Sequence, residues 1–261
     1  MTAPEQLLDL ALRVARQAGE RVVEMRRQGV SVAATKTSEV DGVTGADRAS
    51  EELIREVVLA ERPADGFVGE EGADRAGTSR VQWIVDPIDG TVNYLYGLPL
   101  YAVSIAAAVD GQVVAGVVLN PAAGEEYAAV RGAGATCNGT PVRVRPFVSL
   151  QQSLLGTGFN YEESVRTRQG QALARVLPRI RDIRRLGSCA LDLCAVASGH
   201  LDAFVEEGVH LWDHAAGALV AQEAGARVEV TTGASGRDLI ICAPEESFDT
   251  FRGLARDAGM F

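Results

Sequence analysis

Five carboxylates stand directly after short apolar runs in this sequence. They are Glu70 and Glu71 in FVGEEG, Asp86 and Asp89 in WIVDPIDGT, and Asp213 in HLWDHAAG. Grouped carboxylates repel one another and are costly to desolvate unless a cation pairs with them. Carboxylate and carbonyl oxygens are the preferred ligands of hard divalent ions such as Mg²⁺. If the fold brings the three segments together, the sequence predicts a two-metal site suited to in-line phosphoryl displacement.

The residues that follow Asp89 suit the same chemistry. Gly90 and Thr91 stand where a short helix can begin, so their backbone N–H groups are available to bind a phosphate. The Thr91 hydroxyl can orient a water molecule. Asp213 is expected to open another helix as its N-cap, with one oxygen on the helix and the other on a metal. Each segment alone is also typical of an ordinary turn or cap, and the set of three favours the metal site.

The elements of the first half must bring these acids to one place. Apolar periodicity predicts helices at about 4–27 and 44–61. Short strands at 67–68 and 82–85 run straight into the acidic segments. The dipeptide Asp110-Gly111 predicts a two-residue hairpin turn between two apolar runs. We therefore expect two helices packed on an antiparallel sheet.

The second half alternates strands with helices. Helices are predicted at about 162–176, 188–199 and 213–225, with short apolar strands between them. This alternation is typical of a layered α/β arrangement. We expect an N-terminal half, residues 1–146, and a C-terminal half, residues 147–261, packed as one compact unit.

The composition limits the functions that the chain can have. The 261 residues are 47% hydrophobic and carry a formal net charge of −10, which argues against a nucleic-acid partner. An RNA-associated or regulatory role is kept as an alternative because four arginines cluster: Arg179, Arg181, Arg184 and Arg185. The four cysteines form no C-x-x-C pair, and neither a signal peptide nor a membrane-length apolar run is found. These features predict reduced thiols and a cytoplasmic protein without a membrane partner.

Four segments of the chain match one known pattern. DPIDGTVNY and WDHAAGALVAQEAGA closely resemble the two signature motifs of the inositol monophosphatase family, which are Mg²⁺-dependent, lithium-sensitive phosphatases. KTSEVDGVTGADRASE and GFVGEEG resemble two upstream motifs of that family, so the similarity covers almost the whole chain. The resemblance implies an α/β/α/β/α layered fold, a homodimer and two or three Mg²⁺ ions per site.

The resemblance also implies which positions hold the metal. The matching ligands are Glu70, Asp86, the backbone carbonyl of Ile88, Asp89 and Asp213. Asp86 would bridge the two principal ions. Glu71 would support the metal shell, and Lys36 matches a lysine near it.

The family pattern implies roles in phosphate binding and catalysis as well. Gly90 and Thr91 would bind the phosphate. Asp47 matches the acid that pairs with the motif threonine, and together with Thr91 and Glu70 it would activate a metal-bound water. Direct attack by this water on phosphorus requires no serine or cysteine nucleophile.

Selection of the substrate rests on fewer positions. In the inositol enzymes, an acid seven residues before the motif aspartate contacts inositol hydroxyls, and Glu206 occupies that position. Cys189 aligns with a small residue lining the same pocket. We therefore expect hydrolysis of inositol-1-phosphate, a phosphorylated polyol, to myo-inositol and phosphate. Histidinol phosphate is the main alternative because its cationic amine would also favour an acid, and fructose-1,6-bisphosphate and NADP are further esters handled by this scaffold.

Overall fold

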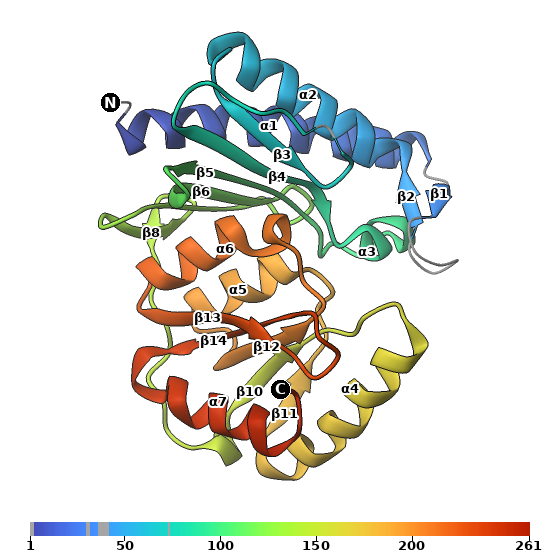
Figure 1. Ribbon diagram of the computed structural model, residues 1–261, viewed down its shortest axis with the longest axis vertical. Coiled ribbons are helices and arrows are strands. Elements are labelled where there is room, and N and C mark those ends of the chain that lie inside the picture. The colour runs from blue at the N-terminus through green and yellow to red at the C-terminus, as the bar shows by residue number, and fades with distance from the viewer. Residues whose placement is uncertain (1–2, 30–31, 36–41, 73) are drawn as a thin grey trace.

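The computed structural model describes residues 3–29, 32–35, 42–72 and 74–261, whose strands form two stacked sheets (Figure 1). In spatial order, the first sheet contains β3 (Gly66–Gly69), β4 (Val81–Asp89), β5 (Ala102–Val109), β6 (Gln112–Asn120), β7 (Glu125–Val130), β8 (Gly134–Cys137) and β9 (Thr140–Pro141). The second contains β11 (Asp182–Arg184), β10 (Leu154–Thr157), β12 (Ala203–Glu207), β14 (Asp238–Pro244) and β13 (Ala226–Thr232). A separate antiparallel pair consists of β1 (Val32–Thr35) and β2 (Gly42–Thr44).

Helices cover the sheets and fill the space between them. They are α1 (Pro4–Gln28), α2 (Gly45–Glu61), α3 (Thr91–Tyr96), α4 (Glu163–Val176), α5 (Cys189–Ala197), α6 (Leu211–Glu223) and α7 (Phe248–Asp257). Helices α1 and α2 pack on one face of the first sheet, α5 and α6 lie between the sheets, and α4 and α7 cover the outer face of the second (Figure 1). The predicted α/β/α/β/α layering is confirmed.

Strand β4 is anchored on both of its faces. Trp83 and Val85 belong to the apolar cluster formed with α1 and α2, whereas Ile84 belongs to the cluster formed with α5 and α6. This follows from the geometry of a strand, in which successive side chains point to opposite faces. Trp83 is 0% exposed, and burial of such a side chain contributes about 2–3 kcal/mol. The packing therefore fixes the position of the acidic segment at the end of β4.

The first sheet is not purely antiparallel, as the sequence had suggested, because β3 pairs with β4 in parallel. The register places Gly69 opposite Val85. Parallel strands run in the same direction, so Glu70, which follows Gly69, and Asp86, which follows Val85, lie side by side. The pairing that the sequence prediction missed is the one that brings these acids together.

The acidic segment is also more regular than a free turn. Strand β4 continues through Asp86 to Asp89 instead of ending at residue 85, and its pairing with β5 shifts between these two residues. Two β4 residues separate them where β5 has one, which is a β-bulge. A bulge bends a strand and redirects its side chains. Asp86 and Asp89 therefore remain attached to the sheet while the chain turns toward α3.

The remaining expectations concern the hairpin and the two halves. Asp110 and Gly111 have φ angles of 51° and 81°, which confirms the predicted turn.

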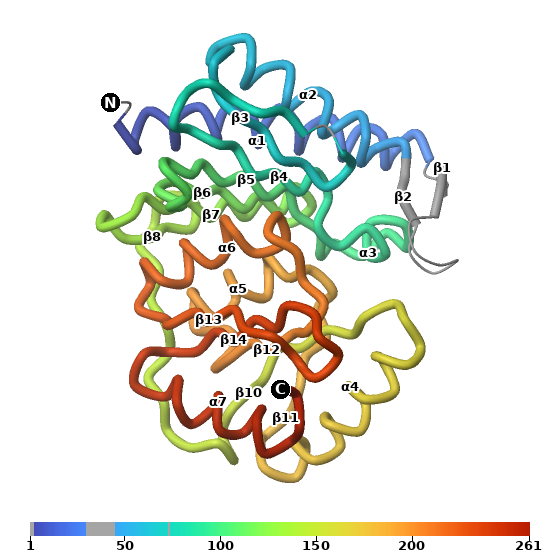
Figure 2. Tube along the Cα trace, viewed as in Figure 1, coloured from blue at the N-terminus to red at the C-terminus, as the bar shows by residue number. Residues whose placement is uncertain are grey.

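The division of the chain into two halves at residue 146 stays a proposal, and this position falls between β9 and β10. The chain begins in the upper half and ends in the lower half of Figure 2. None of the described helices is long and apolar enough to cross a bilayer.

Candidate active site

A cavity of about 950 Å³ receives residues from both halves of the chain. Its lining includes these residues singled out from the sequence: Glu70, Asp86, Ile88, Asp89, Gly90, Thr91, Cys189, Glu206 and Asp213. Asp47 and Glu71 do not line the cavity; Asp47 contacts Thr91 at its wall, and Glu71 follows the lining residue Glu70 and contacts Glu51. Lys36 lies outside the described residues. The tertiary structure thus gathers the three acidic segments at one place.

The carboxylates of the cavity are close enough to perturb one another strongly. Asp86 is 2% exposed, and its pKa is raised well above the ordinary range, first by burial and then by the charges of Glu70, Asp89 and Asp213. Asp86 and Glu70 are also within hydrogen-bond reach of each other. The pKa of Asp213 is raised for the same reasons, burial first and Asp89 next. The cluster therefore resists carrying several negative charges at once without a cation.

Asp89 is held by the N-terminal end of helix α5. The Ser188 hydroxyl donates to Asp89 Oδ2 at 2.5 Å, and the Ala190 amide donates to the same oxygen at 2.7 Å. Burial raises the pKa of Asp89 to about 6, while these two donors lower it. Sequence reasoning identified Ser188 only as the start of a helix, which the N-cap bond from the Leu191 amide confirms. Its contact with Asp89 was missed because 99 residues separate the two.

Asp213 occupies a different position in its helix from the one predicted. Helix α6 begins at Leu211 rather than at residue 213, with His210 as the N-cap. Asp213 is the third helical residue, and its Oδ2 accepts a hydrogen bond from the His210 amide at 2.6 Å. An acid at this position commonly reaches back to the N-cap amide. The prediction of an N-cap was wrong, but one oxygen of Asp213 still caps the helix.

Thr91 links helix α2 to the end of β4. Its hydroxyl lies 3.2 Å from Asp47 Oδ1 and 3.1 Å from the carbonyl oxygen of Ile88, and it can donate to either. Asp47 is 1% exposed. Gly90 has a φ of +92°, and a Cβ there would come within 2.9 Å of the Leu100 carbonyl oxygen. This close packing fixes the turn that presents Thr91 to the cavity.

Glu71 contacts helix α2 through Glu51, a residue that the sequence analysis did not single out. The Glu71 amide donates to Glu51 Oε2 at 2.8 Å, and Arg48 Nε lies 3.9 Å from Glu71 Oε2. Glu51 is 2% exposed, and a Cβ at Gly69 would clash with its carboxylate. Helix α2 therefore supports both Thr91 and the Glu70-Glu71 segment. The only sequence signal for this support is the four-residue spacing of Asp47 and Glu51, which places both acids on the same face of a helix.

The donors of the cavity fit a hard divalent cation. Among the described residues, no group of three or more His, Cys, Asp or Glu side chains is arranged to hold a metal ion, so the fit rests on the chemistry of the donors. Glu70, Asp86, Asp89 and Asp213 supply carboxylate oxygens at one cavity, and Ile88 lines it as well. Hard cations such as Mg²⁺ take carboxylate and carbonyl oxygens. Such an ion would neutralise the repulsion that, after burial, raises the pKa values of Asp86 and Asp213.

The cavity also contains the two residues expected to select the substrate, Glu206 and Cys189. Burial raises the pKa of Glu206 to about 7, while Arg185 lowers it. Gly158 packs so closely on Glu206 that a Cβ would clash with the carboxylate. The pKa of Cys189 is raised well above its usual range, first by burial and then by the charge of Glu206. This thiol therefore stays protonated, which disfavours a cysteine nucleophile.

Asp192 is a buried carboxylate that the sequence did not single out. It lies on α5, it is 1% exposed, and neither of its oxygens has a hydrogen-bond partner among the described protein groups. Burial is the main cause that raises its pKa well above the ordinary range, followed by the charges of Glu206 and Asp89. Only its place in an apolar helical run, CALDLCAVA, could have signalled a buried acid.

We expect Asp192→Asn to stabilise the fold. A raised pKa in the folded state means that folding becomes less favourable as pH rises above the ordinary carboxyl value of about 3.9. The amide has nearly the same shape but never ionises. The variant should therefore melt roughly 2–6 °C above wild type at pH 8, and the difference should shrink at pH 5. Thermal unfolding at both pH values measures this, and a lower melting temperature for the variant at pH 8 contradicts it.

The chain is similar to known proteins over most of its length. The sequence model of the inositol monophosphatase family matches residues 3–254. Inositol-1-monophosphatase SuhB of Mycobacterium tuberculosis is 45% identical over 237 residues, which are 86% of this chain and 82% of the relative. Nus factor SuhB of Pasteurella multocida is 40% identical over 224 residues, 85% of this chain and 84% of the relative. The solved structure of Mycobacterium tuberculosis SuhB matches with a TM-score of 0.87, 40% identity and 100% coverage of both chains.

Proposed function

Because the chain belongs to the inositol monophosphatase family, we propose that it is a Mg²⁺-dependent phosphomonoesterase acting on inositol-1-phosphate. The observation that carries this proposal is the convergence of four carboxylates, from the segment after β3, from β4 and from α6, beside the Gly90-Thr91 turn. A phosphatase needs oxygen ligands for cations and N–H donors for phosphate at one place. Both kinds of group line this cavity.

The proposed reaction assigns the metal to the residues named above. Glu70, Asp86, Asp89, Asp213 and the Ile88 carbonyl would hold Mg²⁺, which when bound lowers the pKa of water and neutralises charge that develops on phosphate oxygens. The number of ions, two or three, is the one that the family pattern implies. The protein residues orient the attacking water and donate hydrogen bonds to the phosphate.

Thr91 has the central orienting role in this proposal. When its hydroxyl donates to Asp47, the lone pairs of Thr91 Oγ1 can accept a hydrogen bond from the attacking water. Glu70, which lines the same cavity, would accept the proton of that water. The backbone N–H groups at Gly90 and Thr91, the first of helix α3, have no acceptor within the helix and can bind phosphate oxygens. Glu71 would support the arrangement through its contact with Glu51.

The substrate proposal rests on Glu206 and on the names of relatives. The Mycobacterium tuberculosis relative is named an inositol-1-monophosphatase. A carboxylate such as Glu206 can accept hydrogen bonds from two polyol hydroxyls. Histidinol phosphate is the second candidate, since an ammonium group can also donate to Glu206.

Phosphate release from a panel of esters tests the proposed function. The panel contains inositol-1-phosphate, histidinol phosphate, fructose-1,6-bisphosphate and NADP, each with Mg²⁺ and with EDTA. We expect Mg²⁺-dependent release, with the highest kcat/KM for inositol-1-phosphate. Absence of release from every ester in Mg²⁺ refutes the enzyme proposal, and a higher kcat/KM for another ester refutes the substrate.

Glu206→Gln tests the proposed contact with the alcohol. The amide keeps the size of the side chain but accepts fewer hydrogen bonds, so kcat/KM for inositol-1-phosphate should fall about 10- to 100-fold. The value for p-nitrophenyl phosphate, whose leaving group has no hydroxyls to recognise, should change less than about threefold. Equal losses on both esters rule out this contact.

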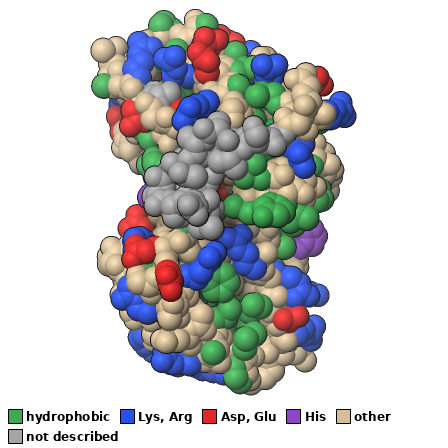
Figure 3. Space-filling model, turned by 90° about the vertical axis from the view of Figure 1, so that its right-hand side faces the viewer, with side chains coloured by type: hydrophobic (Ala, Val, Ile, Leu, Met, Phe, Trp, Pro, Cys, Tyr) green, Lys and Arg blue, Asp and Glu red, His purple; other side chains and the backbone are tan. Residues whose placement is uncertain are grey.

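An RNA-associated role is the non-enzymatic alternative, and relatives named Nus factor SuhB keep it open. The clustered arginines give it little support. Arg179 pairs with Asp257, Arg184 pairs with Asp182, and Arg185 faces the cavity. On the face in Figure 3, basic, acidic and apolar side chains are interspersed. Salt-dependent RNA binding that is lost when these arginines are neutralised would favour the alternative.

The homodimer, the lithium sensitivity and the cytoplasmic location are carried over from the sequence and stay proposals. Light scattering of the purified chain measures the oligomeric state. Inhibition of Mg²⁺-dependent phosphate release by LiCl, with NaCl as the matched salt, measures lithium sensitivity.

A further inference from the structure

We propose that Arg185 is a specificity-determining residue that acts together with Glu206. In this proposal the pair recognises two neighbouring hydroxyl groups of a neutral polyol, and Arg185 disfavours alcohols that carry an ammonium group. The inference rests on the proposed phosphatase function and identifies the class of ester that the site selects.

The position of Arg185 is set by the loop that follows β11. Arg185 lines the same cavity as Glu206 and Cys189. Gly187 has a φ of +93°, and a Cβ there would clash with Arg185 Nη1 and come within 2.8 Å of Asn93 Nδ2. The guanidinium therefore lies back across Gly187, beside Asn93. Asn93 Nδ2 in turn donates at 2.7 Å to the Leu186 carbonyl, which holds this loop against helix α3.

The guanidinium of Arg185 forms no ion pair with another group of the described chain. The neighbouring Arg184 pairs with Asp182 at 2.8 Å. Arg237, the other arginine of the cavity, pairs with Glu162 and lies 3.4 Å from Ser235 Oγ. Arg185 makes no such bond within the described chain, and it is the cation that acts on Glu206 and on Asp192. Its guanidinium is therefore available to a ligand in the cavity.

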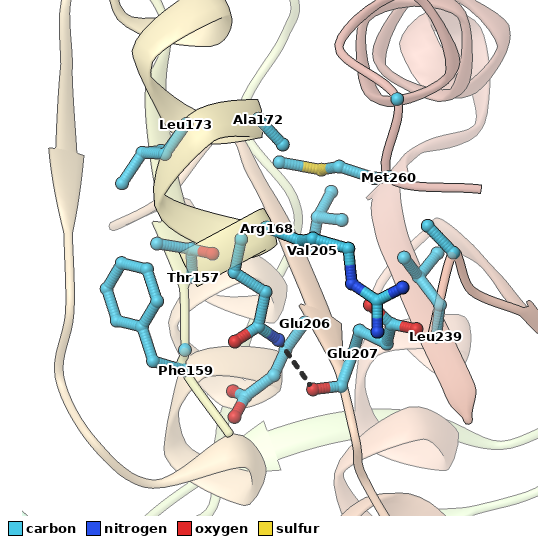
Figure 4. A pocket seen from close by; sticks show the side chains of 14 residues that line it. Thr157, Phe159, Arg168, Ala172, Leu173, Val205, Glu206, Glu207, Leu239 and Met260 are labelled. Carbon is cyan, nitrogen blue, oxygen red and sulfur yellow. Dashed lines mark hydrogen bonds between the residues drawn. The ribbon is translucent and has the colours of Figure 1, made fainter. Parts of the chain in front are cut away.

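Glu206 is presented by a firmly held strand end. In Figure 4 the side chains of Glu206 and Glu207 point to different sides of β12. Gln169 Nε2 donates to the Glu207 carbonyl at 3.0 Å (Figure 4), and the Ser235 amide and hydroxyl each donate to the Glu207 carboxylate at 2.6 Å. These bonds hold the end of β12 in place. The Glu206 carboxylate, a hydrogen-bond acceptor, and the Arg185 guanidinium, a donor, line the same cavity.

This combination discriminates by chemistry. A hydroxyl both donates and accepts, so each of two neighbouring hydroxyls can donate to Glu206 and accept from Arg185. An ammonium group can only donate, and it carries the same charge as Arg185, which repels it. Glu206 alone therefore does not separate a polyol from an amino alcohol, whereas Glu206 with Arg185 does.

Arg185→Gln tests the proposal in the full chain with Mg²⁺. We expect KM for inositol-1-phosphate to rise about tenfold with kcat within about twofold, because a contact to the alcohol is lost rather than a contact to the reacting phosphate. The kcat/KM for p-nitrophenyl phosphate should stay within about twofold, and that for histidinol phosphate should rise at least about threefold. Calorimetric binding of myo-inositol to the metal-free protein should weaken by the same factor as KM.

Arg184→Gln is the matched control, since it removes the same charge next to the loop without facing the cavity, and its kinetics should equal those of wild type. Arg185→Lys keeps the charge but not the planar fork, so it should still reject histidinol phosphate while recovering only part of the polyol affinity. Equal losses for inositol-1-phosphate and p-nitrophenyl phosphate, or a fall for histidinol phosphate, overturn the proposal. If wild type hydrolyses these esters and Arg185→Gln equals it, only this inference fails, whereas an inactive wild type refutes the proposed function itself.

Discussion

Replacing Asp86 with asparagine is expected to abolish phosphate release while making the metal-free protein more stable. The amide side chain keeps an oxygen that can accept from the Ile88 amide, as the carboxylate of Asp86 does at 3.0 Å, but it removes one charge from the buried cluster. Loss of a proposed bridging ligand should lower kcat/KM by about 1,000-fold or more. Without metal, the same change relieves repulsion from Glu70, Asp89 and Asp213, so the melting temperature in EDTA at pH 7.5 should rise by roughly 2–8 °C.

The measurement combines kinetics with thermal unfolding in Mg²⁺ and in EDTA. Addition of Mg²⁺ should stabilise wild type more than Asp86→Asn, because binding to the folded state adds to stability in proportion to affinity. Asp192→Asn is the matched control, since it also removes a buried carboxylate but should retain phosphate release. An Asp86→Asn protein that melts below wild type in EDTA, or that retains activity, would contradict the metal-site proposal.

Replacing Thr91 with valine is expected to lower kcat by about 100- to 1,000-fold, the lower part of the range of about 100- to 10,000-fold that general acid–base groups contribute. Valine has nearly the shape of threonine but cannot bond to Asp47 or to the Ile88 carbonyl, which lie 3.2 and 3.1 Å from the hydroxyl. Since Thr91 is proposed to orient the attacking water, the loss should appear in kcat on every ester of the panel and on p-nitrophenyl phosphate as well.

Thr91→Ser provides the control for this effect. Serine keeps the hydroxyl and should retain at least about a third of the wild-type kcat. Asp47→Asn should lower kcat less than Thr91→Val, because an amide oxygen can still accept from the Thr91 hydroxyl. A Thr91→Val enzyme with wild-type kcat removes the hydroxyl from the proposed mechanism, and a loss confined to KM assigns Thr91 to binding alone.

Features that depend on neighbouring residues were predicted correctly from the sequence, whereas the pairing of distant segments was not. Helix α1 was predicted at about 4–27 and is found at Pro4–Gln28, since apolar periodicity is a local property. The Asp110-Gly111 turn and the Ser188 cap were found for the same reason. The expectation of a purely antiparallel first sheet was wrong, because the four-residue strand β3 carries no signal for the direction of its partner.

The sequence by itself determined the layered fold, the family and the acids that the motifs contain, because these follow from short patterns and their spacing. The tertiary structure alone decided how those acids meet. Parallel pairing places Glu70 beside Asp86, helix α5 holds Asp89 through Ser188, and the loop after β11 turns Arg185 toward the cavity of Glu206. These contacts join residues that are distant along the chain, and only the packing of the layers brings them within hydrogen-bond or Coulomb range.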